Sequence, residues 1–264
     1  MIEVQNLHIR FGAGTPLEVH ALRGIDLIIP RHQFVTVIGS NGAGKSTLLN
    51  ALSGDAPVET GCVRIANEDV TRLPSFRRAH RVARVFQDPK AGTCENLTIE
   101  ENLALAARRG QRRGLSRAVK AELTEQFRDA LSRLGLGLEK RLGEKMGQLS
   151  GGQRQAVSLV MATLRPLDIL LLDEHTAALD PKTAAFVLEL TERIVAEKQL
   201  TVLMVTHSMK QALQHGDRIL MLHEGRIAFD IEGEARAKLT VRDLLAQFEK
   251  QRGEELEDDS LLLG

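Results

Sequence analysis

Aromatic residues are scarce in this sequence of 264 residues, at 3% of the chain with no tryptophan and no tyrosine. Single-stranded nucleic acid binds by stacking its bases on aromatic side chains, so few such platforms can form here. Lys plus Arg number 35 and Asp plus Glu number 35, which leaves a formal net charge of zero. Tight nucleic-acid binding is driven by excess positive charge, so we expect no nucleic-acid partner.

A local exception to this charge balance is the basic run RRGQRRGLSR at Arg108–Arg117. Runs of charge are most often solvated loops or helix ends, and that is the expectation here. Contact with anionic lipid head groups or with a partner protein is the alternative.

Cysteine is also rare, and Cys62 and Cys94 lie far apart in the sequence without metal-ligating neighbours. Both are predicted to be free thiols in a reducing cytosol. Apolar and polar residues alternate in the first stretch, MIEVQNLHIRFG, which also carries charges. It therefore differs from the apolar centre of a signal peptide. No stretch approaches the ~18 consecutive apolar residues that a membrane span needs, so work at a membrane would require a partner.

Hydrophobic residues are plentiful, at 43% of a chain whose length suits one large domain or a domain with an inserted lobe. Alternation and short apolar runs predict strands at 2–11, 22–30, 34–39, 168–174 and 200–208, a short strand within 61–70 before a turn, and a hairpin over 218–230 that turns at Glu224 and Gly225. Helical spacing predicts helices at 45–54 (with Gly54 as the cap), 98–110 (with Thr98 and Glu101 as a capping box), 116–135, 151–164 and 181–198. Strands that alternate with helices in this way indicate a largely parallel sheet with helices on both faces.

A glycine-rich segment, GSNGAGKST, ends the apolar strand 34–39 and opens a helix. Glycines let backbone N–H groups turn toward phosphate oxygens, and the positive end of the helix dipole adds to the attraction. Lys45 supplies a point charge for the outer phosphates, and Ser46 supplies a hydroxyl for Mg²⁺. The pattern therefore predicts a nucleotide phosphate site made by Gly39, Ser40, Asn41, Gly42, Ala43, Gly44, Lys45, Ser46 and Thr47.

Two acidic residues end the apolar run ILLLDE, a strand expected to neighbour the phosphate loop. Asp173 is placed to hold Mg²⁺ through its water shell. Glu174 follows in an extended strand end, so its side chain is expected to point away from that of Asp173. It can polarise an attacking water as a general base. A surface pair of acids that caps the strand is the alternative.

A second helix start of the phosphate-binding kind is LSGGQ, in which Ser150, Gly151, Gly152 and Gln153 lead into an apolar helix. Taken alone, this motif is most simply an N-cap serine followed by glycines. Together with the phosphate loop, LLLDE and the histidine of MVTHS, it resembles the ATP-binding cassette (ABC) ATPases over nearly the whole chain. The resemblance implies that two subunits pair head to tail, so that LSGGQ of one covers the γ-phosphate held by the phosphate loop of the other.

Four further residues take roles from this resemblance, although each is ordinary by itself. Gln87 in VFQDP matches the glutamine that touches Mg²⁺ and the attacking water, and His207 matches the switch histidine at the γ-phosphate. Asp180 in AALDP matches an aspartate that crosses the dimer interface, or else caps the helix that begins at Pro181. Phe11 lies where an adenine-stacking aromatic is usual, commonly Tyr, and keeps the stacking face without the hydroxyl. The expected catalytic set is Glu174, His207, Lys45 and Gln87, and the expected metal set is Ser46, Gln87 and Asp173.

One departure from the family pattern is His175, because proline usually follows the catalytic glutamate. Loss of proline frees φ, restores a backbone N–H and adds a titratable ring near Glu174. We expect hydrolysis to survive this difference, and His175→Pro to keep more than about a tenth of the ATPase rate.

The fold implied by the resemblance is α/β and of the P-loop NTPase (RecA-like) type: a mostly parallel sheet, an N-terminal antiparallel β subdomain and an inserted α-helical lobe. The ATPase domain is expected over 1–248, with the lobe at 88–161, and 249–264 as an acidic, frayed tail. The resemblance extends to a branch of importer-type ABC ATPases associated with tryptophan, tyrosine or uncharacterised solutes. It is carried by the segments VFQDPKAGTCENLTIEENLALA and DEHTAALDPKTA.

The function implied is that of an ATPase subunit at the cytoplasmic face of the membrane. It would bind ATP and Mg²⁺, form a homodimer on ATP binding, and drive an integral-membrane permease that works with a separate solute-binding protein. The alternative is a soluble ABC ATPase without a transport role, as in iron–sulfur cluster assembly. DNA-repair ATPases of the superfamily carry long coiled coils between the two motifs and translation-type factors carry two cassettes, and this sequence has neither.

Overall fold

The computed structural model describes residues 1–111 and 121–252. Its contacts divide the chain into two compact units, and each is described by itself. The first unit comprises Met1–Arg78 together with the chain from Leu200 onward, and the second comprises Ala79–Gln199. Most of the basic run 108–117 and the acidic tail beyond residue 252 lie outside the described residues.

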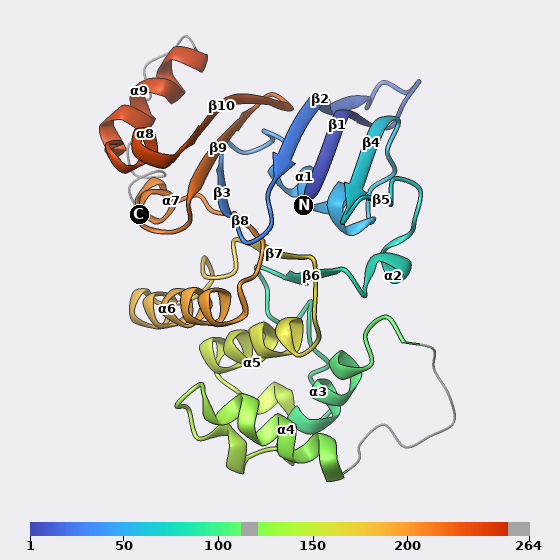
Figure 1. Ribbon diagram of the computed structural model, residues 1–264, viewed down its shortest axis with the longest axis vertical. Helices are drawn as coiled ribbons and strands as arrows, with labels where there is room; N and C mark the ends of the chain where they lie inside the picture. The colour runs from blue at the N-terminus through green and yellow to red at the C-terminus, as the bar shows by residue number, and fades with distance from the viewer. Residues whose placement is uncertain (112–120, 253–264) are drawn as a thin grey trace. The chain divides into compact units, whose positions relative to one another are not determined.

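An antiparallel sheet opens the first unit, with β1 between β2 and β4 (Figure 1). Its strands are β1 (Ile2–Phe11), β2 (Val19–Ile29), β4 (Thr60–Ile65) and β5 (Glu68–Asp69). One face of the sheet is apolar because alternate residues such as Ile2, Val4, Ile25 and Leu27 are buried. The N-terminal antiparallel sheet expected from the sequence is therefore present.

The first unit also contains four strands that pair in the order β10, β9, β3, β8, with both parallel and antiparallel neighbours. These are β3 (Phe34–Ile38), β8 (Val202–Val205), β9 (Arg218–His223) and β10 (Arg226–Glu232). Strand β3 is buried throughout and runs parallel to both β8 and β9. Strands β9 and β10 form the predicted hairpin, whose turn residues Glu224 and Gly225 both have positive φ, as a tight two-residue turn requires.

Five helices of the first unit lie in its described residues: α1 (Lys45–Ser53), α2 (Ser75–Arg78), α7 (Met209–Gln214), α8 (Gly233–Ala237) and α9 (Val241–Arg252). Helix α9 packs Leu244 and Phe248 into a cluster with Met209 of α7 and Ile219 of β9. The expected tail boundary at 249 thus falls inside α9, which continues to Arg252.

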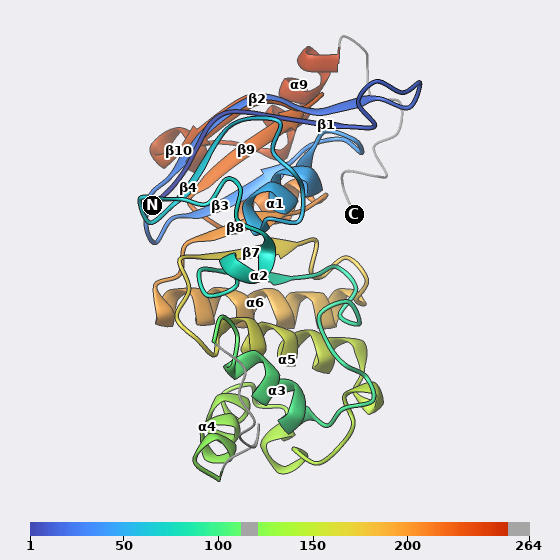
Figure 2. The same ribbon diagram turned by 90° about the vertical axis from the view of Figure 1, so that its right-hand side faces the viewer.

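The second unit contains a parallel strand pair and the main helices. They are β6 (Val82–Val85), β7 (Ile169–Asp173), α3 (Ile99–Ala107), α4 (Ala121–Ser132), α5 (Gly151–Thr163) and α6 (Pro181–Lys198), with 3₁₀ turns at Leu138–Lys140 and Met146–Gln148. Helix α5 lies between α6 on one side and α3 and α4 on the other (Figures 1 and 2). This position explains why nearly all of its residues are buried.

Most of the predicted elements are confirmed. Helix α6 spans the expected 181–198, and α1 has Gly54 as its cap, as expected, with a left-handed φ of 85°. Thr98 and Glu101 form the predicted capping box of α3. The sequence interpretation did not foresee β6, α2, α7 and α8, which have four to six residues each, or the 12-residue helix α9. No helix in the described ranges has the length and apolar character needed to cross a membrane.

Candidate functional site

The phosphate loop predicted at 39–47 connects β3 to α1. Two of its glycines are required by the backbone. Gly39 has φ of 153°, and a Cβ there would lie 2.3 Å from the carbonyl oxygen of Leu222. Gly44 has φ of 102°, and a Cβ there would lie 2.7 Å from the carbonyl oxygen of Ala21. The loop therefore approaches its neighbours as closely as only glycine allows.

Lys45 begins α1 and is only 6% exposed. Its ammonium donates to the carbonyl oxygens of Gly39 at 2.6 Å and Ser40 at 3.0 Å, which holds the side chain across the loop. The N-cap, Gly44, has no side chain to accept hydrogen bonds from the first turn, and that turn contains no acidic residue. A positive helix end combined with a lysine is suited to binding phosphate oxygens.

His207 lies at the same sheet edge as this loop. It follows β8, which pairs in parallel with β3 so that Val205 lies opposite Val37. The N–H of Thr206 donates to the carbonyl of Val37 at 3.1 Å, and Ser208 caps α7. His207 is thus held in a short connection between a buried strand and a helix, and it is partly exposed.

Phe11 is the last residue of β1 and its side chain is 41% exposed. Leu17 and Val19, across the adjoining loop, are exposed as well. An exposed aromatic face at a strand end is available for stacking, as its expected contact with adenine requires.

Asp173 and Glu174 lie in the second unit, at the carboxyl end of β7. Asp173 is paired with Arg84 of β6, whose Nη2 donates to Oδ2 at 2.5 Å. The guanidinium of Arg84 also lies 4.8 Å from the ring centre of Phe86. Sequence reasoning missed Arg84, because β6 has only four residues and was not recognised as a strand.

Gln87 comes two residues after the end of β6, beside the end of β7, because Val85 pairs with Leu172. The structure thus brings Gln87 and the Asp173–Glu174 pair to the carboxyl ends of two adjacent parallel strands. The preceding residue, Phe86, accepts a hydrogen bond at 3.0 Å from Nε2 of Gln155, a fully buried residue of α5. Gln155 was also missed, because it stands among other polar residues near the start of α5 and the sequence alone does not single it out.

Glu174 has φ of 45°, a left-handed conformation that is uncommon for residues other than glycine. Its carbonyl accepts from the N–H of Ala177 at 2.9 Å, which closes a tight turn directly after the strand. The expected extended strand end at Glu174 is therefore wrong, because β7 ends at Asp173 and Glu174 begins a turn with a left-handed backbone.

Ser150 is the N-cap of α5, and it forms a capping box with Gln153. The hydroxyl oxygen of Ser150 accepts from the N–H of Gln153 at 3.2 Å, and Oε1 of Gln153 accepts from the N–H of Ser150 at 3.1 Å. The simple structural role considered for this motif is therefore real. It uses only a lone pair of the serine oxygen, so the O–H remains a donor.

Gly152 is fixed by the contact of α5 with α6. A Cβ at this position would lie 2.1 Å from Cγ2 of Thr183, closer than real Cβ contacts come. Asp180 caps the same end of α6, since its Oδ1 accepts from the N–H of Thr183 at 3.1 Å, with Pro181 in the first turn. Hydrogen bonds from the Thr183 side chain and backbone hold the pKa of Asp180 below its ordinary value.

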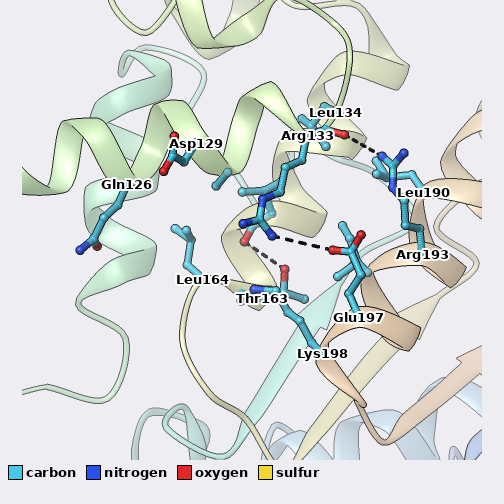
Figure 3. Close-up of a pocket in the computed structure, with 13 residues that line it drawn as sticks. Gln126, Asp129, Arg133, Leu134, Thr163, Leu164, Leu190, Arg193, Glu197 and Lys198 are labelled. Atoms are coloured by element: carbon cyan, nitrogen blue, oxygen red, sulfur yellow. Dashed lines mark hydrogen bonds and ion pairs between the residues drawn. The ribbon is translucent and has the colours of Figure 1, made fainter.

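A separate cavity of about 270 Å³ lies between α4, α5 and α6 (Figure 3). Lys198 donates to the carbonyl of Thr163, the last residue of α5, at 2.5 Å, and Arg193 donates to the carbonyl of Arg133 just after α4 at 2.7 Å. Nη1 of Arg133 lies 3.8 Å from Oε2 of Glu197, which makes an ion pair. Burial lowers the pKa of Lys198. These cations stabilise the carboxyl ends of helices, which accounts for their positions.

Comparison with known proteins identifies the family. The sequence pattern described as ABC transporter matches residues 22–177. The chain is 44% identical to a tyrosine transport ATP-binding protein of Clostridioides difficile (strain R20291), over 94% of this chain and 99% of that one. It is 38% identical to a thiamine import ATP-binding protein of Chelativorans sp. (strain BNC1), over 78% of both chains.

Solved structures agree with this family and with the predicted fold. A dimeric ATP-binding cassette in a post-hydrolysis state bound to ADP and Pi is 29% identical, with a TM-score of 0.74, over 88% of this chain and 98% of that one. The ADP conformation of a second ABC transporter cassette is 25% identical, with a TM-score of 0.78, over 96% and 99% of the two chains. The fold is that of a P-loop NTPase with an N-terminal antiparallel sheet and a mixed sheet with helices, and the chain belongs to the ABC transporter family as one of its ATP-binding ATPases.

Proposed function

We propose that this chain hydrolyses Mg²⁺-ATP as a head-to-tail dimer and thereby energises the uptake of a small solute, such as an amino acid, through a membrane permease. The observation that carries the proposal is the phosphate loop. Its glycines at 39 and 44 cannot carry side chains, and its lysine is held across the loop at the start of α1. These features combine with a match to a transport ATP-binding protein over nearly the full length of both chains.

The nucleotide is bound by the loop 39–47, with Lys45 and the first turn of α1 at its phosphates and Phe11 stacked on adenine. Lys45 exchanges its two carbonyl acceptors in the loop for phosphate oxygens, which attract its charge more strongly. Hydrolysis needs a water aligned with the γ-phosphate and a group that takes its proton. Glu174 takes this proton, while Gln87 and His207 hold the water and the γ-phosphate.

Mg²⁺ fits the residues that we assign to it. The Asp173 carboxylate, the Ser46 hydroxyl and the Gln87 carboxamide offer hard oxygen donors, which this cation prefers. Asp173 already binds one cationic group in this structure, the guanidinium of Arg84. When bound, the metal ion neutralises charge on the β- and γ-phosphates.

The LSGGQ motif at the start of α5 acts on the nucleotide bound by the partner subunit. Ser150 and Gly151 are exposed at the positive end of α5, with the serine O–H still able to donate. Together with Gly152, Gln153 and Asp180, they close over the ATP held by the phosphate loop of the other subunit. A related cassette is a dimer in its post-hydrolysis state, which supports this arrangement.

The partners that we propose are an integral-membrane permease and a separate solute-binding protein, with the ATPase at the cytoplasmic face of the membrane. Residues 1–248 form the ATPase domain, and its helical lobe at 88–161 contacts the permease. Relatives named for the transport of tyrosine and of branched-chain amino acids support an amino acid as the solute. A soluble iron–sulfur assembly role has no support among these relatives.

Two experiments test the proposal. Glu174→Gln should bind ATP, lose turnover and accumulate as a dimer, because the amide cannot accept the water's proton. Turnover by this variant at the wild-type rate would remove the general-base assignment. Affinity purification of the tagged chain from gently solubilised membranes should recover a polytopic permease. Recovery of a soluble scaffold instead would contradict the transport role and leave the ATPase chemistry standing.

A further inference from the structure

His175 is a buried polar residue directly after Glu174. Its side chain is 2% exposed, although it stands in the connection between β7 and α6. The ring points to α6, where Nε2 lies 3.1 Å from Oγ1 of Thr191, a residue with no exposed surface. The titratable ring expected from the sequence is therefore packed into the interior.

The direction of this hydrogen bond follows from the second bond of Thr191. Its hydroxyl donates to the carbonyl of Val187, one turn earlier in α6, at 2.7 Å. A hydroxyl has one hydrogen, so the oxygen must accept from the histidine. Nε2 of His175 therefore carries the hydrogen, and the ring is held in one orientation against the helix.

Glu174 needs such support because of its backbone. Its φ of 45° lies in a sparsely populated region, which persists only where the surroundings hold it. One restraint is the turn that Ala177 closes with its N–H. His175 lies within this turn, so a fixed ring at 175 restricts the same turn from its interior side.

We propose that His175 is a positioning residue for ATP hydrolysis: its hydrogen bond to Thr191 anchors the turn that presents Glu174. This inference rests on the proposed role of Glu174 as the general base. A carboxylate that must lie within hydrogen-bonding reach of an attacking water loses rate steeply when its backbone shifts. The anchor thus contributes to turnover and has no direct part in binding ATP.

Substitutions on both sides of the bond test this role. His175→Leu removes the donor and keeps apolar bulk, whereas His175→Gln keeps an N–H at a similar reach. Thr191→Val removes the acceptor, and Thr191→Ser keeps it. The control is Thr163→Val in α5, because Thr163 is also buried and donates in the same way to the carbonyl of Leu159, at 2.9 Å.

The readouts are kcat, the KM for ATP and the midpoint of thermal unfolding. His175→Leu and Thr191→Val should each lower kcat about tenfold and change KM less than about twofold. His175→Gln and Thr191→Ser should keep at least about half of kcat, and Thr163→Val should keep wild-type kcat. The double variant His175→Leu/Thr191→Val should be no slower than the slower single variant, since both remove one interaction.

The inference would be overturned by wild-type kcat in His175→Leu, by an equal loss of kcat in Thr163→Val, or by a failure of His175→Gln to keep activity. A loss of kcat that only follows a loss of folded protein would equally reduce His175 to a structural residue. Failure of the proposed function is seen separately. If Glu174→Gln turns over ATP, the base assignment falls and this inference with it, whereas an inactive Glu174→Gln beside a fully active His175→Leu removes this inference alone.

Discussion

Arg84 of β6 and Asp173 of β7 form an ion pair of 2.5 Å between neighbouring parallel strands, although 89 positions separate them in the sequence. Both side chains are mostly buried, so the pair is shielded from solvent. Arg81 and Asp168 form a similar pair of 3.0 Å at the opposite end of the same two strands. The first pair contains Asp173, the proposed Mg²⁺ ligand, and the second pair does not. The second pair therefore provides a matched control for the first.

Replacing Arg84 by Met should change the dependence of the ATPase on Mg²⁺. Without the guanidinium, Asp173 loses a cation that competes with the metal, so the Mg²⁺ concentration for half-maximal activity should fall. The stability without nucleotide should fall by about 1–3 kcal/mol, because a mostly buried carboxylate loses its partner. Mg²⁺ titration of ATPase activity and urea unfolding measure the two effects.

Replacing Arg81 by Met is the control for this prediction. It should lower stability without shifting the Mg²⁺ titration. An equal shift in both variants, or none in either, would remove the assignment of Asp173 as the metal ligand.

Replacing Gly152 by Ala should destabilise the protein by about 1–3 kcal/mol, because the new methyl group overlaps Cγ2 of Thr183. A second substitution, Thr183→Ser, removes that methyl group and should restore most of the loss. Gly151→Ala is the control, since its Cβ would meet only Leu179, at 3.4 Å. Urea unfolding of these variants and of the wild type measures this. A Gly152→Ala variant as stable as wild type would show that α5 and α6 can separate at this contact without cost.

Mixing two defective chains should restore ATPase activity if LSGGQ acts on the partner's nucleotide. A Ser150→Arg chain keeps its phosphate loop, and a Lys45→Ala chain keeps its LSGGQ, so their heterodimer has one intact composite site. Each chain by itself should be inactive. No recovery over a range of mixing ratios, with heterodimers detected by crosslinking, would contradict action between subunits.

His175→Pro should keep more than about a tenth of the wild-type ATPase rate. Proline fixes φ near −65°, so it restricts the turn after Glu174 by a different means from the hydrogen bond to Thr191. Steady-state ATPase assays on the purified variant measure this. A dead but folded His175→Pro would show that the imidazole has a role that a rigid backbone cannot replace.

Stability should fall as the pH drops below about 6.5, the ordinary histidine value, in part through His20. Burial lowers the pKa of His20, and the charges of Arg10, His8 and Arg23 lower it further. The folded state therefore favours the neutral ring. As the pH falls, His20 is protonated first in the unfolded chain, and this lowers the free energy of unfolding until the pH reaches the pKa of the folded state. His20→Gln should flatten this decline in urea unfolding between pH 7 and pH 5. An unchanged slope would show that other groups cause it.

Local features of this protein were determined by the sequence itself. The glycine loop before Lys45, the caps at Ser150 and Asp180, and the turn at Glu224 and Gly225 all depend on residues within a few positions of one another. Their chemistry is set by backbone dihedral angles and by side chains that reach their own helix ends. The phosphate loop and both candidate helix starts could therefore be identified from the order of the residues alone.

Only the tertiary structure decided which distant residues support these motifs. Arg84 meets Asp173 because two parallel strands are in register, and Gly152 meets Thr183 because two helices pack closely. His175 was visible in the sequence as a departure from the family pattern, but its partner Thr191 was not. Such contacts depend on packing between elements far apart in the chain, and the pattern within one element does not encode them.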